Sequence, residues 1–229
     1  MTMDPTPRFA YVAQLRELEH EMIQMAAGAE RMVVDAVHAL AELDVETARN
    51  VVKADAEVDN YDLDIENRCI RLLALQSPTG RDLRTIGSAL KIITDIERIG
   101  DLAVDIAKIT LKIDADGGSP SVIDLPKMAN TVTLMFREAI ESYVNRDPDR
   151  VAHVAELEIE VDALYRELRS HVFQHMAGEH SQVVTDGWLL LAVHHLERIA
   201  DHALNIAERV TFIMTGELRQ LAPSEKPLP

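Results

Sequence analysis

Apolar residues recur along the chain in alternating steps of four and three, which is the pattern of a helix that packs one face into a bundle. One stretch shows the pattern in full, with apolar or small residues at Ile92, Ile96, Ile99, Ala103, Ile106, Thr110 and Ile113. Similar patterns fill nearly the whole sequence and leave no room for strands. We therefore predict an all-α protein with helices over 9–43, 45–76, 81–113, 125–146, 148–177 and 183–215.

Residues at the ends of these segments support the division. Asp44 and Asp147 each precede a segment as an N-cap, and Asp147 is followed by proline at the first helical position. Ser-Pro-Thr-Gly at 77–80 separates the second and third helices, and a loop rich in helix breakers occupies 114–121. The predicted organisation is a first three-helix bundle at 1–115, a second at 122–217 and a disordered tail at 218–229.

The two halves of the sequence repeat one another. With an offset of 103, Glu-Val-Asp at 57–59 recurs at 160–162. With an offset of 100, the stretch at 97–107 recurs at 197–207, with Glu, Arg, Ile and Asp in the same places. Loss of three residues from one loop accounts for the change in offset. We infer an internal duplication of a three-helix unit, so the predicted bundles are tandem copies.

Carboxylates follow a four-residue spacing on the predicted third helix. At about 100° per residue, Glu97, Asp101 and Asp105 lie opposite the apolar face, so we expect them to point outward. Like charges at this spacing disfavour a helix by about 0.2–0.5 kcal/mol per pair, and a merely solvated face would alternate in sign. Asp62 and Glu66 have no acidic counterparts in the second half, so we expect them to be ordinary solvated acids. Further pairs with the four-residue spacing are Asp55 with Asp59, Glu158 with Asp162, and Glu197 with Asp201.

Carboxylates from two neighbouring helices are the ligands that a hard or borderline divalent cation requires. We predict one metal patch in each unit. The candidate ligands are Asp55, Asp59, Glu97, Asp101 and Asp105 in the first unit and Glu158, Asp162, Glu197 and Asp201 in the second. His194, one turn before Glu197, is an additional candidate, and Asn205 replaces Asp105 as a weaker, neutral ligand. Oxygen ligands do not distinguish Fe, Zn, Mn and Mg, and a solvated charged face is the alternative.

Charge and cysteine content restrict the partners and the compartment. The chain has 39 acidic and 23 basic residues and a formal charge of −16, which argues against nucleic acid or a bare anionic membrane as the main partner. Cations and basic protein surfaces are the natural counterparts. Cys69 is the only cysteine, which excludes an internal disulfide and fits a reducing compartment. The polar N-terminus and short apolar runs predict a cytoplasmic protein without direct membrane insertion.

Three stretches resemble the PhoU family of phosphate-signalling regulators: DIERIGDLAVDIA at 95–107, HLERIADHALNIA at 195–207 and LQSPTGRDLR at 75–84. The resemblance covers residues 8 to 216. It implies two three-helix bundles that hold multinuclear metal clusters through E/D-x-x-x-D motifs, which here are the four acidic pairs above that start at Asp55, Glu97, Glu158 and Glu197. It also implies a cytoplasmic negative regulator that links the ATPase subunit of the phosphate ABC transporter to a sensor histidine kinase of the PhoR type.

We therefore predict a metal-binding regulatory adaptor that represses the phosphate regulon and phosphate uptake. We expect no enzyme activity, because the sequence has no phosphate-binding glycine loop and no nucleophile beside a base. The alternative is a di-metal carboxylate oxidoreductase of the ferritin-like kind, which needs Glu-x-x-His on two core-facing helices. Only Glu17 and His20 have that spacing. A helical scaffold with incidental acidic faces is a third interpretation, and a homodimer is compatible with the sequence.

Overall fold

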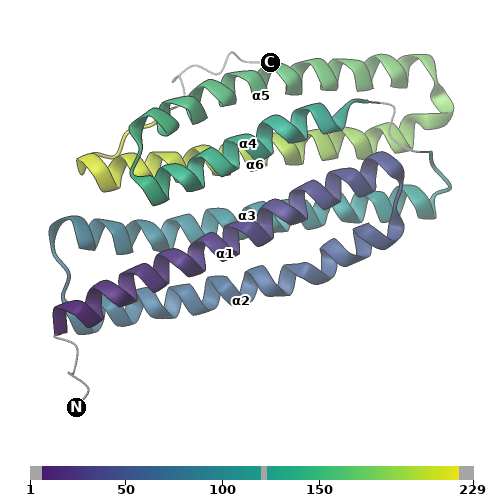
Figure 1. Ribbon diagram of the computed structural model, residues 1–229. Helices are drawn as coiled ribbons and strands as arrows, with labels where there is room; N and C mark the ends of the chain where they lie inside the picture. The colour runs from purple at the N-terminus through teal and green to yellow at the C-terminus, as the bar shows by residue number, and fades with distance from the viewer. Residues whose placement is uncertain (1–6, 120–122, 222–229) are drawn as a thin grey trace.

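The computed structural model describes residues 7–119 and 123–221 and contains no strand in these ranges. The six long helices and one short 3₁₀ turn are α1 (Pro7–Glu42), α2 (Val45–Gln76), α3 (Gly80–Ala115), α4 (Leu125–Asn145), α5 (Pro148–Gly178), η1 (His180–Gln182) and α6 (Val183–Thr215) (Figure 1). The predicted all-α fold is confirmed, and each predicted helix agrees with the structure to within two residues at both ends.

The predicted N-caps account for two of the helix starts. The Asp44 carboxylate accepts hydrogen bonds from the backbone N–H groups of Glu46 and Thr47 at 3.0 and 3.1 Å. Asp147 caps α5 in the same way, and Pro148 follows at the first helical position. These bonds satisfy backbone donors that have no partner within the helix. The chain therefore turns sharply into α2 and α5 directly after the preceding helix.

The six helices form two layers of three. Figure 1 shows α1, α2 and α3 together in one layer and α4, α5 and α6 in the other, with long axes roughly aligned. The layers join where α3 packs along α6 and α1 packs against α4. The buried apolar side chains form one cluster that runs through both layers. The two halves of the chain thus share one hydrophobic core, while the domain boundaries remain a sequence-based prediction.

Polar side chains link α3 and α6 within the junction of the two layers. Asp95 accepts hydrogen bonds from His202 Nδ1 at 2.9 Å and from Asn205 Nδ2 at 3.3 Å. On the equivalent side, burial lowers the pKa of His195, and the nearby Asp105 carboxylate opposes that shift. With the offset of 100, Asp95 corresponds to His195 and Asn205 to Asp105. The hydrogen bond between positions 95 and 205 thus has its counterpart in an electrostatic interaction between positions 195 and 105, as the internal duplication leads one to expect.

The segment after α6 returns to the bundle. Leu221 packs against the core, and its backbone N–H donates to the Glu208 carboxylate at 2.8 Å. Leu221, assigned above to the tail, thus makes defined contacts with the bundle, and 222–229 lie outside the described residues. Residues 120–122 of the predicted breaker-rich loop also lie outside them. None of the described helices combines the length and the apolar character needed to cross a membrane.

Candidate functional site

The structure gathers the acidic residues of the first unit along the seam between α2 and α3. Burial raises the pKa of Asp55, and the negative charges of Asp59 and Asp101 raise it further. Burial also raises the pKa of Glu97, with Asp101 as the strongest neighbouring charge. Asp105 adds a smaller contribution at Asp55. These five residues, which we call the first acidic patch, are therefore close enough to repel one another.

Asp62 belongs to the same electrostatic neighbourhood, which the sequence analysis did not expect. Burial raises its pKa, followed by the charges of Glu66 and Asp59. Asp62 in turn contributes to the raised pKa of Glu97. The sequence does indicate this position, because steps of four and three place Asp62 on the same helix face as Asp55 and Asp59. The partial burial of Asp62 comes with the packing of α2 against α3, which its non-acidic counterpart in the second half does not indicate.

Basic residues of α3 partly neutralise the first acidic patch. Arg98 contacts Asp101 at 3.0 Å and Glu97 at 3.4 Å, and Lys108 contacts Asp105 at 3.3 Å. The side chains of the three acids are 25 %, 41 % and 47 % exposed from Glu97 to Asp105. The outward orientation predicted for them is only partly correct, because α3 packs against α1, α2 and α6 and has little free surface. The acids lie at the edge of a helix seam.

The second unit differs from the first most clearly at Glu158. This residue is buried with 4 % exposure, so the outward orientation expected for the acids of the third helix does not extend to this acid of the second unit. The physical reason is its place in the apolar stripe of α5, four residues after Val154 and three before Val161, both of which are buried. Glu197 is also mostly buried and contacts His194 Nδ1 at 3.4 Å. The two units therefore share the spacing of their acidic residues but differ in how deeply those residues are buried.

The remaining predicted ligands, Asp162 and Asp201, are partly exposed on α5 and α6. Across residues 7–119 and 123–221, no three His, Cys, Asp or Glu side chains are gathered closely enough to hold one ion. The donor chemistry of the first acidic patch still fits a divalent cation, because several carboxylates from two helices crowd one seam. A cation would relieve the repulsion that raises the pKa of Asp55. The metal patches therefore remain a prediction.

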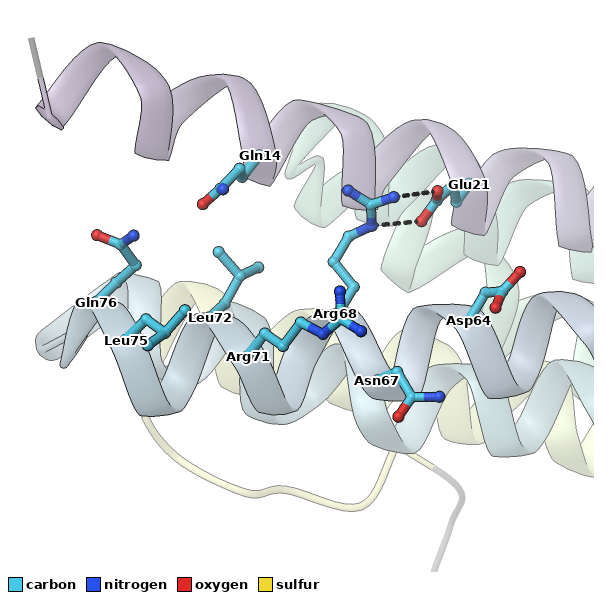
Figure 2. A pocket seen from close by; sticks show the side chains of 9 residues that line it. All are labelled: Gln14, Glu21, Asp64, Asn67, Arg68, Arg71, Leu72, Leu75 and Gln76. Atoms are coloured by element: carbon cyan, nitrogen blue, oxygen red, sulfur yellow. Dashed lines mark hydrogen bonds and ion pairs between the residues drawn. The ribbon is translucent and has the colours of Figure 1, made fainter.

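A groove of about 580 Å³ lies between the start of α1 and the end of α2. Figure 2 shows Arg68 reaching from α2 to the Glu21 carboxylate, with bonds of 2.8 and 2.6 Å. Arg68 also contacts Glu17 at 2.9 Å. Glu17, the carboxylate required by the ferritin-like alternative, thus lies at the surface and pairs with an arginine, and His20 is exposed as well. Neither side chain faces the bundle core.

The PhoU domain profile matches this chain twice, over residues 22–110 and 125–210. The chain is 33% identical over 211 residues to a phosphate-specific transport system accessory protein PhoU homolog of Clostridium acetobutylicum. The alignment covers 92% of this chain and 96% of that relative. It is 34% identical to the homolog of Caulobacter vibrioides, with 91% of each chain covered.

Solved structures agree with the sequence comparison. The crystal structure of PhoU from Pseudomonas aeruginosa superposes with a TM-score of 0.86 at 30% identity and covers 90% of this chain and 100% of that chain. The phosphate transport system regulatory protein PhoU from Streptococcus pneumoniae gives a TM-score of 0.83 at 27% identity, with 91% and 99% covered. The repeated domain, the acidic pairs and the six-helix architecture all lead to one conclusion: the chain belongs to the PhoU family.

Proposed function

We propose that this protein is a metal-binding regulatory adaptor of the phosphate transport system. In this proposal it acts in the cytoplasm as a negative regulator of phosphate uptake and of the phosphate regulon. It connects the ATPase subunit of the phosphate ABC transporter to a sensor histidine kinase of the PhoR type. The proposal is supported by family membership and by the names of its relatives, which are accessory or regulatory proteins of phosphate transport.

The observation that carries the metal-binding part is the crowding of carboxylates between α2 and α3. Asp55 is partly buried and surrounded by like charges, so its ionised form is disfavoured in the absence of a cation. A divalent cation replaces that repulsion with attraction. Metal occupancy then changes the charge of this partly exposed seam, and a partner that docks at its edge responds to the change.

The charge of the whole chain favours basic partner surfaces. At −16 the protein attracts positively charged segments over long range and repels nucleic acid. We propose no catalytic turnover. The thiol of Cys69 is buried and its pKa is raised to about 12, so it is not an activated nucleophile.

The metal assignment is tested by replacing Asp59→Asn and Asp101→Asn together. The double variant should bind less metal, by about one patch's share, with its helical content unchanged. Elemental analysis after purification without added metal or chelator gives the stoichiometry, and circular dichroism gives the helicity. The matched control is Asp64→Asn with Asp114→Asn, which removes the same charge from exposed positions on the same two helices. Equal metal content in both double variants would rule out the first acidic patch.

The adaptor role is tested by deleting the gene in cells with ample phosphate. Phosphate-uptake genes should then remain expressed, because the negative regulator is missing. The purified protein should also retain a PhoR-type kinase or the transporter ATPase on an affinity column. Full repression in the deletion strain together with retention of neither partner would contradict the proposal. Oxygen consumption by a reduced, metal-loaded sample would instead favour the ferritin-like alternative.

A further inference from the structure

Helix α5 carries three potential metal ligands at four-residue intervals: Glu167, His171 and His175. All three line one groove of about 540 Å³ between α5 and the start of α4. Side chains four residues apart on a helix are neighbours, with Cβ atoms about 5–6 Å apart. The two imidazoles are therefore adjacent along one groove, at a distance from the acidic seam between α2 and α3.

A buried carboxylate fixes one of these imidazoles. Asp186 on α6 is only 1 % exposed, and its Oδ2 lies 2.8 Å from His175 Nδ1. In the tautomer that carries its proton on Nδ1, the ring donates this hydrogen bond to Asp186 and leaves the Nε2 lone pair available to a metal. The His175 side chain is 32 % exposed and lines the groove. A carboxylate that holds the second nitrogen of a histidine is the usual support of a metal-ligating imidazole.

We propose that His171 and His175 form a chelating site for a borderline divalent cation of the Zn²⁺ class. Two histidines at i and i+4 on one helix face have the spacing used by helical zinc sites. Among the described residues no three His, Cys, Asp or Glu side chains gather around one point, so the site proposed here has two protein ligands. Water, or Glu167 after rotation of its side chain, completes the coordination. Imidazole nitrogen favours Zn²⁺, Ni²⁺ and Cu²⁺ over Mg²⁺ and Ca²⁺, which prefer carboxylates.

The local charge is compatible with a bound cation. Asp124 and Glu167 each contribute a negative charge to the groove lining, and Lys127 contributes one positive charge. The Asp124 carboxylate caps α4 by accepting the Lys127 backbone N–H at 3.3 Å, so it supports the groove wall and leaves ligation to α5. With neutral imidazoles, these side chains leave the groove with one net negative charge.

Calorimetric titration of the full chain with Zn²⁺ tests the site. All proteins in this experiment also carry Asp59→Asn and Asp101→Asn, so that Zn²⁺ binding by the first acidic patch contributes less to the signal. His171→Gln with His175→Gln should remove one Zn²⁺ equivalent or weaken it by about tenfold or more. The control is His20→Gln with His38→Gln, two exposed histidines of α1 that do not line this groove. Excess Mg²⁺ should not displace the metal. Equal Zn²⁺ binding by both histidine variants, or displacement by Mg²⁺, overturns the proposal.

Ring ¹⁵N chemical shifts distinguish metal binding from a purely structural role, because the ring nitrogens of a purely structural His–Asp pair would not respond to added Zn²⁺. Zn²⁺ should shift one ring nitrogen in each of His171 and His175, with Nδ1 of His175 remaining protonated. Asp186→Asn should weaken Zn²⁺ binding by about 10–100-fold through loss of that support. His171→Gln alters only an exposed side chain and keeps the test decisive if Asp186→Asn fails to fold. Unchanged ring nitrogens at saturating Zn²⁺ overturn the proposal, whatever metal the acidic patch binds.

Discussion

Single carboxylates in this protein differ widely in environment. Asp55, Asp62 and Glu97 have raised pKa values because they are partly buried beside like charges. Asp44 has a lowered pKa, because its carboxylate accepts hydrogen bonds from Thr47. The first group opposes folding when ionised, whereas Asp44 favours folding when ionised. Local contacts, and not residue type, decide which effect an acid has.

These directions predict the pH dependence of stability. A raised folded-state pKa means that the folded protein binds protons more readily than the unfolded chain. The metal-free protein should therefore gain stability as the pH falls from neutral through the raised pKa values towards the ordinary carboxylate range near ~4. The lowered pKa of Asp44 acts below that window. The metal-loaded protein should instead lose stability as protons compete with the cation. Melting curves of both forms at several pH values in matched salt check the prediction.

Asp55→Asn isolates one of the residues responsible for this effect. At neutral pH the metal-free variant should be more stable, by about 0.2–0.5 kcal/mol for each like-charge pair relieved. Its stability should also change less with pH. Asp64→Asn is the control, because Asp64 is an exposed acid on the same helix. If the wild-type, Asp55→Asn and Asp64→Asn proteins show parallel pH dependence, the acidic seam is an ordinary solvated surface.

At the scale of elements, the helix starts are stabilised in different ways. The Asp147 side chain accepts backbone bonds at the start of α5, at 2.9 and 3.4 Å. Thr79 precedes α3 without a capping hydrogen bond from its side chain. Gly80 begins α3 with φ +58°, a backbone conformation that glycine adopts at little cost. The turn into α3 therefore depends on backbone geometry more than on a cap.

Substitution of the two cap residues should separate these mechanisms. Asp147→Ala should lower the free energy of unfolding by about 1 kcal/mol, because backbone donors of α5 lose their acceptor. Thr79→Ala should have a much smaller effect. Urea unfolding followed by circular dichroism measures both. Equal losses would show that the Asp147 side chain does not act as an N-cap in solution.

The sequence predicts the bounds of the helices better than it predicts the burial and the neighbouring charges of single side chains. Helix bounds follow from apolar spacing and from caps such as Asp44, which are local properties, and they agree closely with the structure. The burial of Glu158 and the inclusion of Asp62 in the acidic seam depend on which helices surround them. The site on α5 also depends on tertiary contact, since Asp186 comes from another helix. Spacing identifies candidate ligands, and packing determines their charge state and accessibility.

At the scale of the whole molecule, the shared core predicts cooperative unfolding. The apolar cluster continues through both layers, and α3 is buried on most sides by α1, α2 and α6. Exposing one bundle would therefore uncover apolar surface on the other. We expect one thermal transition whose calorimetric enthalpy equals the van't Hoff enthalpy. Two resolved transitions would show that the bundles unfold independently.

The hydrogen bonds at Asp95 offer a sharper test of that coupling. Asp95→Ala removes the acceptor of His202 and Asn205 and should cost about 1–3 kcal/mol. Lys91→Ala, one turn earlier at an exposed position, is the control. Hydrogen exchange should accelerate in both α3 and α6 of the Asp95 variant. Acceleration confined to α3 would mean that the contact does not couple the layers.

The same polar pairs determine which half of the chain recognises which. In an assembly of two first halves, Asp95 would face Asp105 where it now faces Asn205, and two carboxylates would meet. In an assembly of two second halves, His195 would replace Asp95 opposite His202, and no carboxylate would accept the imidazole hydrogen. Each half thus discourages a copy of itself and favours its complement. The two repeats are therefore no longer interchangeable, and each pairs preferentially with the other. If the chain is cut between them, the two fragments should reassemble only as a mixed pair.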